Sequence, residues 1–94
     1  KHFHGAYYSL VVFLLSGAVG PKYTCVVSKK TARRAVDRNR AKRVCRELIR
    51  KHTARVKCPG AFVFRVKASA LDASHPKLSE DIATLVKEAV QYFE

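Results

Sequence analysis

The stretch SKKTARRAVDRNRAKRVCRELIRK, residues 28–51, decides how this chain folds. Thirteen of the 19 Lys and Arg residues lie between Lys29 and Lys57, where the only acids are Asp37 and Glu47. The whole chain has a formal net charge of +12, so almost all of the excess charge sits in this one segment. Positive charge this concentrated predicts a strongly anionic partner, with nucleic acid favoured over an anionic membrane surface.

The second part of this stretch has the period of an α-helix. Apolar residues recur at i, i+3, i+4, i+7 and i+8, which predicts one buried stripe. That stripe consists of Ala41, Val44, Cys45, Leu48 and Ile49. The opposite arc carries Asn39, Lys42, Arg43, Arg46 and Arg50. A helix face that is merely solvated usually interleaves acids with its cations, so this arc indicates a binding surface. Either Asp37 caps the helix, or the helix begins earlier with Thr31 as its cap.

The sequence before the basic stretch predicts two strands. Residues 6–15 form the first, and we expect its second half to be buried on both faces because the alternation disappears there. Gly and Pro at 16–21 predict a reversal into an antiparallel hairpin. The partner strand is residues 22–28, with Tyr23, Cys25 and Val27 on one face.

The sequence after the basic stretch predicts one more strand and one more helix. Residues 61–68 alternate, with Phe62, Phe64 and Val66 sharing a face. Residues 71–77 are expected to be a loop broken by Pro76, and the final helix to start at 79–81. The chain is therefore expected to be a single α+β domain, residues 1–94, in which helices cover a small sheet.

Composition limits the cellular setting. The three cysteines have no close pair, which favours reduced thiols and a cytoplasmic location. The apolar run at 10–15 is far shorter than the roughly 20 residues of a membrane-spanning helix. A signal-peptide core is the sharper alternative, given Lys1 before it and Ser16-Gly17-Ala18 behind it. The strand-forming residues in and around the run argue against that alternative.

No catalytic residue and no metal site is predicted. The four His and three Cys residues lack the spacing of a metal site, and the few acids are dispersed. His2 and His4 would project to one side of a strand, although a solvated, frayed terminus explains them better. No Gly-rich phosphate loop is present, and no small-molecule cofactor is expected. Cys25 and Cys45 are expected to be buried and inert.

RNA suits the chain better than DNA. A helix that reads the DNA major groove normally belongs to an all-helical or zinc-finger domain, and neither is predicted here. An uncharged, aromatic strand face can stack unpaired bases, as it does in proteins that bind single strands.

Three ordered motifs carry a family resemblance. They are Val26-Val27-Ser28-Lys29-Lys30, then Ala35-Val36, then Arg38-Asn39-Arg40-x-Lys42-Arg43-x-x-Arg46-Glu47. In these motifs the chain resembles the bacterial ribonuclease P protein component. The resemblance implies a small α-β sandwich of the ribosomal protein S5 domain 2-like type, with a mixed sheet and a left-handed βαβ crossover. The strand pattern alone would predict a right-handed crossover. The family's N-terminal helix is expected to be missing before Lys1.

The resemblance also implies a function. The protein would be the non-catalytic accessory subunit of an RNA-based endoribonuclease, whose RNA removes the 5′ leader of precursor tRNA. Mg²⁺ would act through the RNA, without a protein cage. By position in the motifs, or between them in the case of Arg33 and Arg34, the residues expected to bind the ribonuclease P RNA are Lys29, Lys30, Arg33, Arg34, Arg38, Asn39, Arg40, Lys42, Arg43 and Arg46. The residues expected to contact the leader are Tyr7, Val11, Phe13 and Lys67.

Two other functions remain open on the sequence. One is a different basic RNA-binding module, such as a small ribosomal protein without a processing role. The other is a basic helix on a membrane surface, which would need an exposed apolar face. The membrane hypothesis conflicts with the prediction that Val44, Leu48 and Ile49 belong to the core, so no membrane partner is expected.

Overall fold

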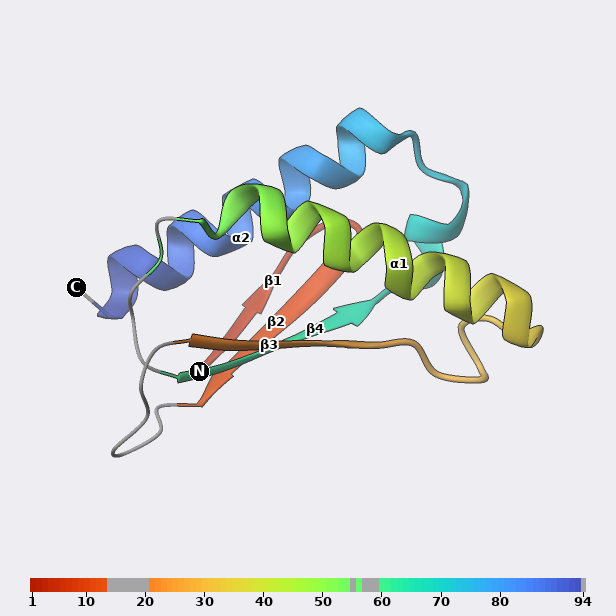
Figure 1. Cartoon of the computed structure of the whole chain (residues 1–94), viewed down its shortest axis with the longest axis horizontal. Coiled ribbons are helices and arrows are strands. Elements are labelled where there is room, and N and C mark those ends of the chain that lie inside the picture. The colour runs from red at the N-terminus through yellow and green to blue at the C-terminus, as the bar shows by residue number, and fades with distance from the viewer. Residues whose placement is uncertain (14–20, 55, 57–59, 94) are drawn as a thin grey trace.

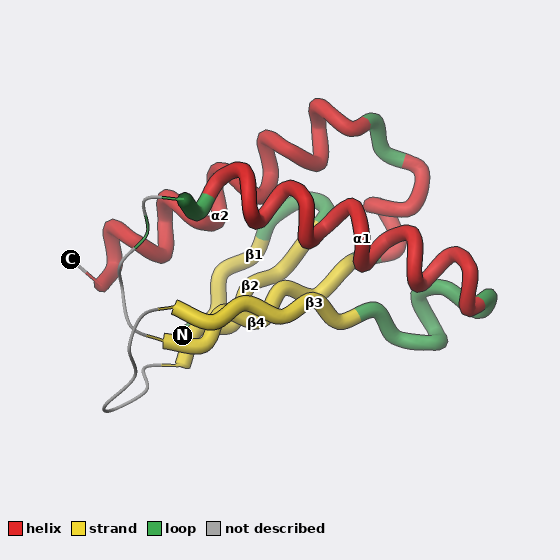
Figure 2. Tube along the Cα trace, viewed as in Figure 1, coloured by secondary structure: helices red, strands yellow, loops and turns green. Residues whose placement is uncertain are grey.

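A computed structural model describes residues 1–13, 21–54, 56 and 60–93 of the chain. Two helices lie together over one face of a four-stranded sheet (Figures 1 and 2). The elements in chain order are β1 (His2–His4), β2 (Tyr8–Phe13), β3 (Pro21–Val26), α1 (Ala35–His52), β4 (Gly60–Val66), the 3-10 helix η1 (Ala68–Asp72) and α2 (His75–Phe93). The predicted α+β class is confirmed.

The sheet is mixed, with the strand order β1-β2-β4-β3. β3 and β4 are parallel, whereas β1 with β2 and β2 with β4 are antiparallel. Because α1 connects the two parallel strands, β3, α1 and β4 form a βαβ unit, and its crossover is left-handed (Figure 1). This is the uncommon hand that the resemblance implied, and the general rule for such units would have given the other one.

The predicted hairpin between the first two long strands is wrong. β4 lies between β2 and β3, so these two strands do not pair with each other. Leu10 of β2 and Cys25 of β3 both pair with Phe64 of β4. β4 suits this interior place, because Phe62 and Phe64 are buried on one side and Val63 is half-buried on the other. The predicted turn at 16–20 and the end of the first strand at 14–15 lie outside the described residues.

The first residues form an edge strand: His2 and His4 are solvated as expected, but the terminus is paired with β2 and not frayed. His2 pairs with Val11, and the amino group of Lys1 donates to the Val12 carbonyl at 3.1 Å. Phe3 meets the ring of Tyr92 on α2 edge-on, with 6.0 Å between ring centroids. A three-residue strand is too short to show alternation, so the sequence pattern does not predict that β1 pairs with β2.

The final helix begins earlier than the sequence pattern suggests. α2 starts at His75, inside the segment expected to be loop, and Pro76 lies in its first turn. Proline is tolerated there because the first N–H groups of a helix have no partner within the helix. The last two residues of η1, Leu71 and Asp72, also fall within the expected loop.

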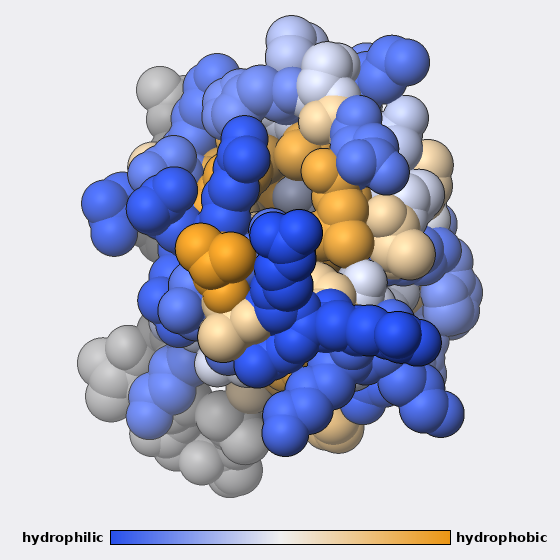
Figure 3. Space-filling model, turned by 90° about the vertical axis from the view of Figure 1, so that its right-hand side faces the viewer, coloured by the Kyte–Doolittle hydropathy of each residue, from blue (hydrophilic) through white to orange (hydrophobic). Residues whose placement is uncertain are grey.

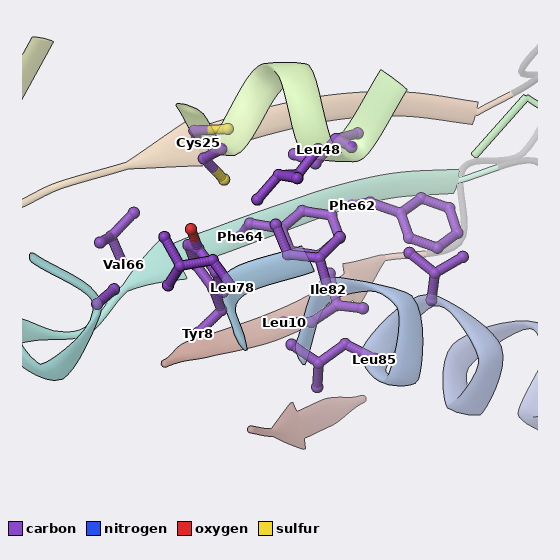
Figure 4. Packing of buried hydrophobic residues seen from close by; sticks show 14 of the residues in the cluster. Tyr8, Leu10, Cys25, Leu48, Phe62, Phe64, Val66, Leu78, Ile82 and Leu85 are labelled. Carbon is purple, nitrogen blue, oxygen red and sulfur yellow. The ribbon is translucent and has the colours of Figure 1, made fainter. Parts of the chain in front are cut away.

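The core lies between the sheet and the two helices (Figure 4). The predicted apolar stripes face the core: Phe62, Phe64 and Val66 of β4 are buried, as are Cys45, Leu48 and Ile49 of α1, whereas Ala41 and Val44 are half-buried against it. Burying each of the larger side chains contributes about 1.5–3 kcal/mol relative to exposure. Cys25 and Cys45 are also buried, as predicted, whereas Cys58 lies outside the described residues.

His52 is expected to make the fold sensitive to mild acid. Its Nε2 and the Ser79 hydroxyl are 2.8 Å apart and join the end of α1 to α2. Burial, and secondarily the charge of Lys51, lower the pKa of His52. The unfolded chain therefore takes up this proton first, so the stability from His52 is complete above about pH 6.5 and declines as the pH falls toward its folded pKa.

We expect His52→Gln to reduce the loss of melting temperature between pH 7 and pH 5, measured by circular dichroism. His4→Gln, on the exposed edge strand, is the control that should leave this loss unchanged.

Candidate nucleic-acid interface

α1 presents cations to solvent because its apolar stripe fixes which side faces the sheet. Opposite that stripe, Asn39, Arg40, Arg43, Arg46 and Arg50 are exposed and Lys42 is half-buried. Within the part of the chain that the structure describes, no carboxylate forms an ion pair with these cations. Their charge is therefore left for a partner, at some cost in self-repulsion.

The loop between β3 and α1 extends this charged side. The Ser28 hydroxyl accepts from the Thr31 N–H at 3.1 Å, and the two hydroxyl oxygens of Ser28 and Thr31 are 2.9 Å apart. The Ala32 N–H also donates to the Ser28 carbonyl, at 3.1 Å. The turn fixed in this way exposes Lys29 and Lys30.

Arg38 has a role that the sequence pattern did not show. Its Nη1 donates to the carbonyl oxygens of Ala32 at 2.9 Å and Arg33 at 2.7 Å, and the side chain is half-buried. Arg38 thus ties the loop that carries Arg33 and Arg34 to the first turns of α1. A guanidinium has five N–H donors, so donors remain for a phosphate.

Neither predicted cap of α1 is found. The N-cap residue is Arg34, whose side chain makes no capping hydrogen bond. Thr31 belongs to the preceding turn, and Asp37 lies inside the first turn, where its charge favours the helix dipole. We call the loop and the outer side of α1 as far as Arg46 the cationic surface. It contains Lys29, Lys30, Arg33, Arg34, Arg38, Asn39, Arg40, Lys42, Arg43 and Arg46.

The face of the sheet away from the helices forms a second surface, which we call the open sheet face (Figure 1). Its residues are His2, His4, Ser9, Val11, Phe13, Lys22, Thr24, Val26, Ala61, Val63 and Arg65. Phe13 is 54% exposed and Val26 is 41% exposed. The imidazole rings of His2 and His4 are stacked, with centroids 6.4 Å apart. Proteins that bind single-stranded nucleic acid stack the bases on exposed aromatic rings and hold the backbone with nearby cations.

The four residues expected to contact a leader fall into two pairs. Val11 and Phe13 lie on the open sheet face. Val11 is buried there, so the prediction that the strand is buried on both faces is confirmed at Val11. Phe13 is exposed, so the same prediction is wrong at Phe13. Tyr7 and Lys67 lie together at the other end of β2, where the Lys67 N–H donates to the Tyr7 carbonyl at 2.9 Å. The Lys67 ammonium also donates to the Gly5 carbonyl at 2.6 Å, and Tyr7 packs against the core.

Asp81 organises the bend that precedes β2, and sequence reasoning missed it. Its carboxylate accepts from the N–H groups of Ala6 at 3.0 Å, Tyr7 at 3.1 Å and Tyr8 at 3.0 Å. More than seventy residues separate the two partners, and no local pattern signals the contact. The bend is thereby fixed beside Lys67.

The family model for ribonuclease P matches residues 1–90 of the chain. The chain belongs to the ribonuclease P protein family. It is 34% identical over 74 residues to the ribonuclease P protein component of Xanthomonas campestris pv. campestris strain B100, covering 79% of this chain and 49% of the relative. The same figures hold for strain 8004 of that organism. The chain thus spans about half the length of the curated relatives it matches.

Solved structures of family members share the fold. The ribonuclease P protein of Staphylococcus aureus superposes with a TM-score of 0.83 at 19% identity, covering 100% of this chain and 84% of that one. The protein from Thermotoga maritima gives 0.81 at 20% identity, covering 94% and 82%. The resemblance in the motifs and the architecture that it implied are both confirmed. Among the helices formed by the described residues, none has the length and apolarity to cross a membrane.

Proposed function

We propose that the chain is the RNA-binding accessory subunit of ribonuclease P, assisting removal of the 5′ leader from precursor tRNA. One observation carries the proposal: in a member of this family, the exposed cations of α1 and its preceding loop have no carboxylate partner within the described residues. The catalytic RNA would bind the cationic surface, and the leader would bind the open sheet face.

The chemistry of each surface suits its proposed ligand. Arg presents a planar fork of donors that matches phosphate oxygens, while Lys acts as a point charge. Asn39 adds an amide that can donate to and accept from bases or sugars. On the open sheet face, Phe13 offers a ring for an unpaired base, and Lys22 and Arg65 offer charge to the backbone between bases.

The proposal assigns Mg²⁺ to the RNA. Among the described residues, no three His, Cys, Asp or Glu side chains gather closely enough to hold a metal ion. Mg²⁺ commonly binds through phosphates and retained waters, so RNA supplies suitable ligands. Cations of the cationic surface would neutralise phosphates that otherwise require additional Mg²⁺. The protein's own contribution is therefore binding and charge neutralisation.

Reconstitution tests the proposal directly. The chain is added to a bacterial ribonuclease P RNA at a Mg²⁺ concentration too low for the RNA to act alone, and release of the leader is followed on a gel. We expect cleavage to recover. If cleavage stays at the level of RNA alone while the chain still binds RNA, a basic RNA-binding module without a processing role is the correct description.

Phe13 provides a test of the leader surface. We expect Phe13→Ala to weaken binding of precursor tRNA by about fivefold or more, because stacking contributes about 1–3 kcal/mol per base. The measurement is the affinity of the reconstituted ribonucleoprotein for precursor tRNA, and mature tRNA without a leader is the matched control. An equal loss for both substrates would remove Phe13 from the leader surface.

A further inference from the structure

An open pocket lies at the end of the molecule where α1 begins and β4 ends, on the helix side of the sheet. Its volume is about 460 Å³, within the range of roughly 300–1,000 Å³ typical of ligand pockets. Figure 3 looks onto this end and shows a hollow with hydrophobic groups inside and hydrophilic groups around it. The pocket is separate from the open sheet face, because the sheet lies between them.

The inner walls of the pocket are apolar and come from separate elements. Val44 comes from α1, Val66 from β4 and Leu78 from the first turn of α2. Tyr8 also contributes to the lining, and its ring is buried. Apolar walls supplied by several packed elements form a preorganised slot that suits a flat ring.

The rim of the pocket is charged on both sides. Arg40 and Asp37 stand on the first turns of α1, and Asp72 stands on η1. Arg40 belongs to the cationic surface, so the pocket opens directly beside the proposed phosphate contacts. The two carboxylates repel a phosphate but accept hydrogen bonds from amino groups. In nucleic acids such groups belong to adenine, cytosine and guanine.

We propose that this pocket takes one unpaired, amino-bearing nucleobase of the RNA that is bound by the cationic surface. The ring lies between Val44, Val66 and Leu78, the amino group donates to Asp37 or Asp72, and the adjoining phosphate binds Arg40. RNA-binding proteins commonly read single-stranded nucleotides in this way, by holding a splayed base and bonding its polar edge. This inference rests on the proposed function and adds to it a base-selective contact.

Methyl NMR of the isolated chain tests the inference with AMP, CMP, GMP, UMP and ribose 5-phosphate as probes. The three amino-bearing nucleotides are expected to shift the methyl signals of Val44, Val66 and Leu78. UMP, whose base has no amino group, and ribose 5-phosphate, which has no base, should leave these methyl signals unshifted. Equal shifts of the pocket methyls with UMP, or no shift with any nucleotide, would overturn the inference.

Two variants make the test specific. Ala73→Phe fills the pocket from the side of η1 and α2 and should abolish the methyl shifts. Ala68→Phe places the same ring on an exposed residue outside the pocket and should leave the shifts intact. Asp72→Asn, at an exposed rim position, should lower the affinity of the pocket for AMP, CMP and GMP by about fivefold while leaving thermal stability unchanged. Shifts that persist in Ala73→Phe would contradict the proposal.

RNA binding by the same proteins separates the two proposals. Ala73→Phe leaves every cation in place, so its salt dependence of RNA binding should match that of the unaltered protein. If the unaltered protein restores leader cleavage but its pocket methyls do not respond to nucleotides, only the pocket inference fails. If it neither binds RNA with salt dependence nor restores cleavage, the proposed function fails.

Discussion

Replacing Arg43 and Arg46 together with alanine is expected to lower the affinity for ribonuclease P RNA on the order of tenfold to a hundredfold. Both side chains are exposed on the outer side of α1. A hydrogen bond to a charged group contributes about 1.5–3 kcal/mol, so even partial loss of two contacts gives an effect of this size. The fold should persist, because alanine is the best helix former and the change relieves repulsion between cations.

The salt dependence of binding shows whether these two residues touch phosphate. Each phosphate contact adds roughly 0.7–0.9 to the slope of log affinity against log salt, so the double variant should flatten the slope by about 1.4–1.8. Filter binding at several salt concentrations measures this. The matched control is Lys77→Ala with Lys87→Ala, which removes two exposed cations from α2. An unchanged slope in the Arg43 and Arg46 variant would remove both residues from the contact surface.

Local periodicity was sufficient to predict which side of α1 and which side of β4 is buried. The stripe through Cys45, Leu48 and Ile49 and the alternation of Phe62, Phe64 and Val66 were both confirmed, because each follows from one element packing on one core. The outward direction of Arg43 and Arg46 follows from the same geometry. Periodicity alone is therefore enough to locate the outer side of α1, which forms much of the cationic surface.

The order of the strands in the sheet could not be predicted from the hydrophobic pattern. The sequence 16–21 is suited to a reversal, yet a reversal does not determine which strand lies alongside. The neighbour depends on which strand has enough apolar residues to be covered on both edges by other strands. Here β4 takes the place between β2 and β3. The left-handed crossover came from the family motifs, since backbone physics alone favours the opposite hand.

The candidate sites combine residues that the sequence separates. The pocket brings Tyr8, Asp37 and Asp72 together from three elements, and no spacing in the chain signals that. Arg38 illustrates a different limit: the motif identified the residue, but only the structure shows that it holds the loop at Ala32 and Arg33. Residue type can indicate a ligand, whereas a positioning role depends on tertiary contacts.

Asp81→Ala is expected to destabilise the fold by about 3 kcal/mol, because three backbone N–H groups lose a charged acceptor at once. In a domain of this size each kcal/mol lowers the melting temperature by about 4–8 °C, so calorimetry should show a fall of roughly 12–24 °C. Glu80→Ala removes the same charge from an exposed neighbour and should change the melting temperature little. A similar loss in both variants would mean that net charge, and not the hydrogen bonds, sets the effect.

Gly5→Ala should reproduce much of this loss by a different route. A Cβ at Gly5 would lie 2.5 Å from each carboxylate oxygen of Asp81, so the carboxylate must move away from the N–H groups of the bend. Because both substitutions break the same contact, their effects should not add: Gly5→Ala should cost little in a chain that already carries Asp81→Ala. Calorimetry of the two single variants and the double variant measures this coupling. Full additivity would show that the glycine is needed for a reason unrelated to Asp81.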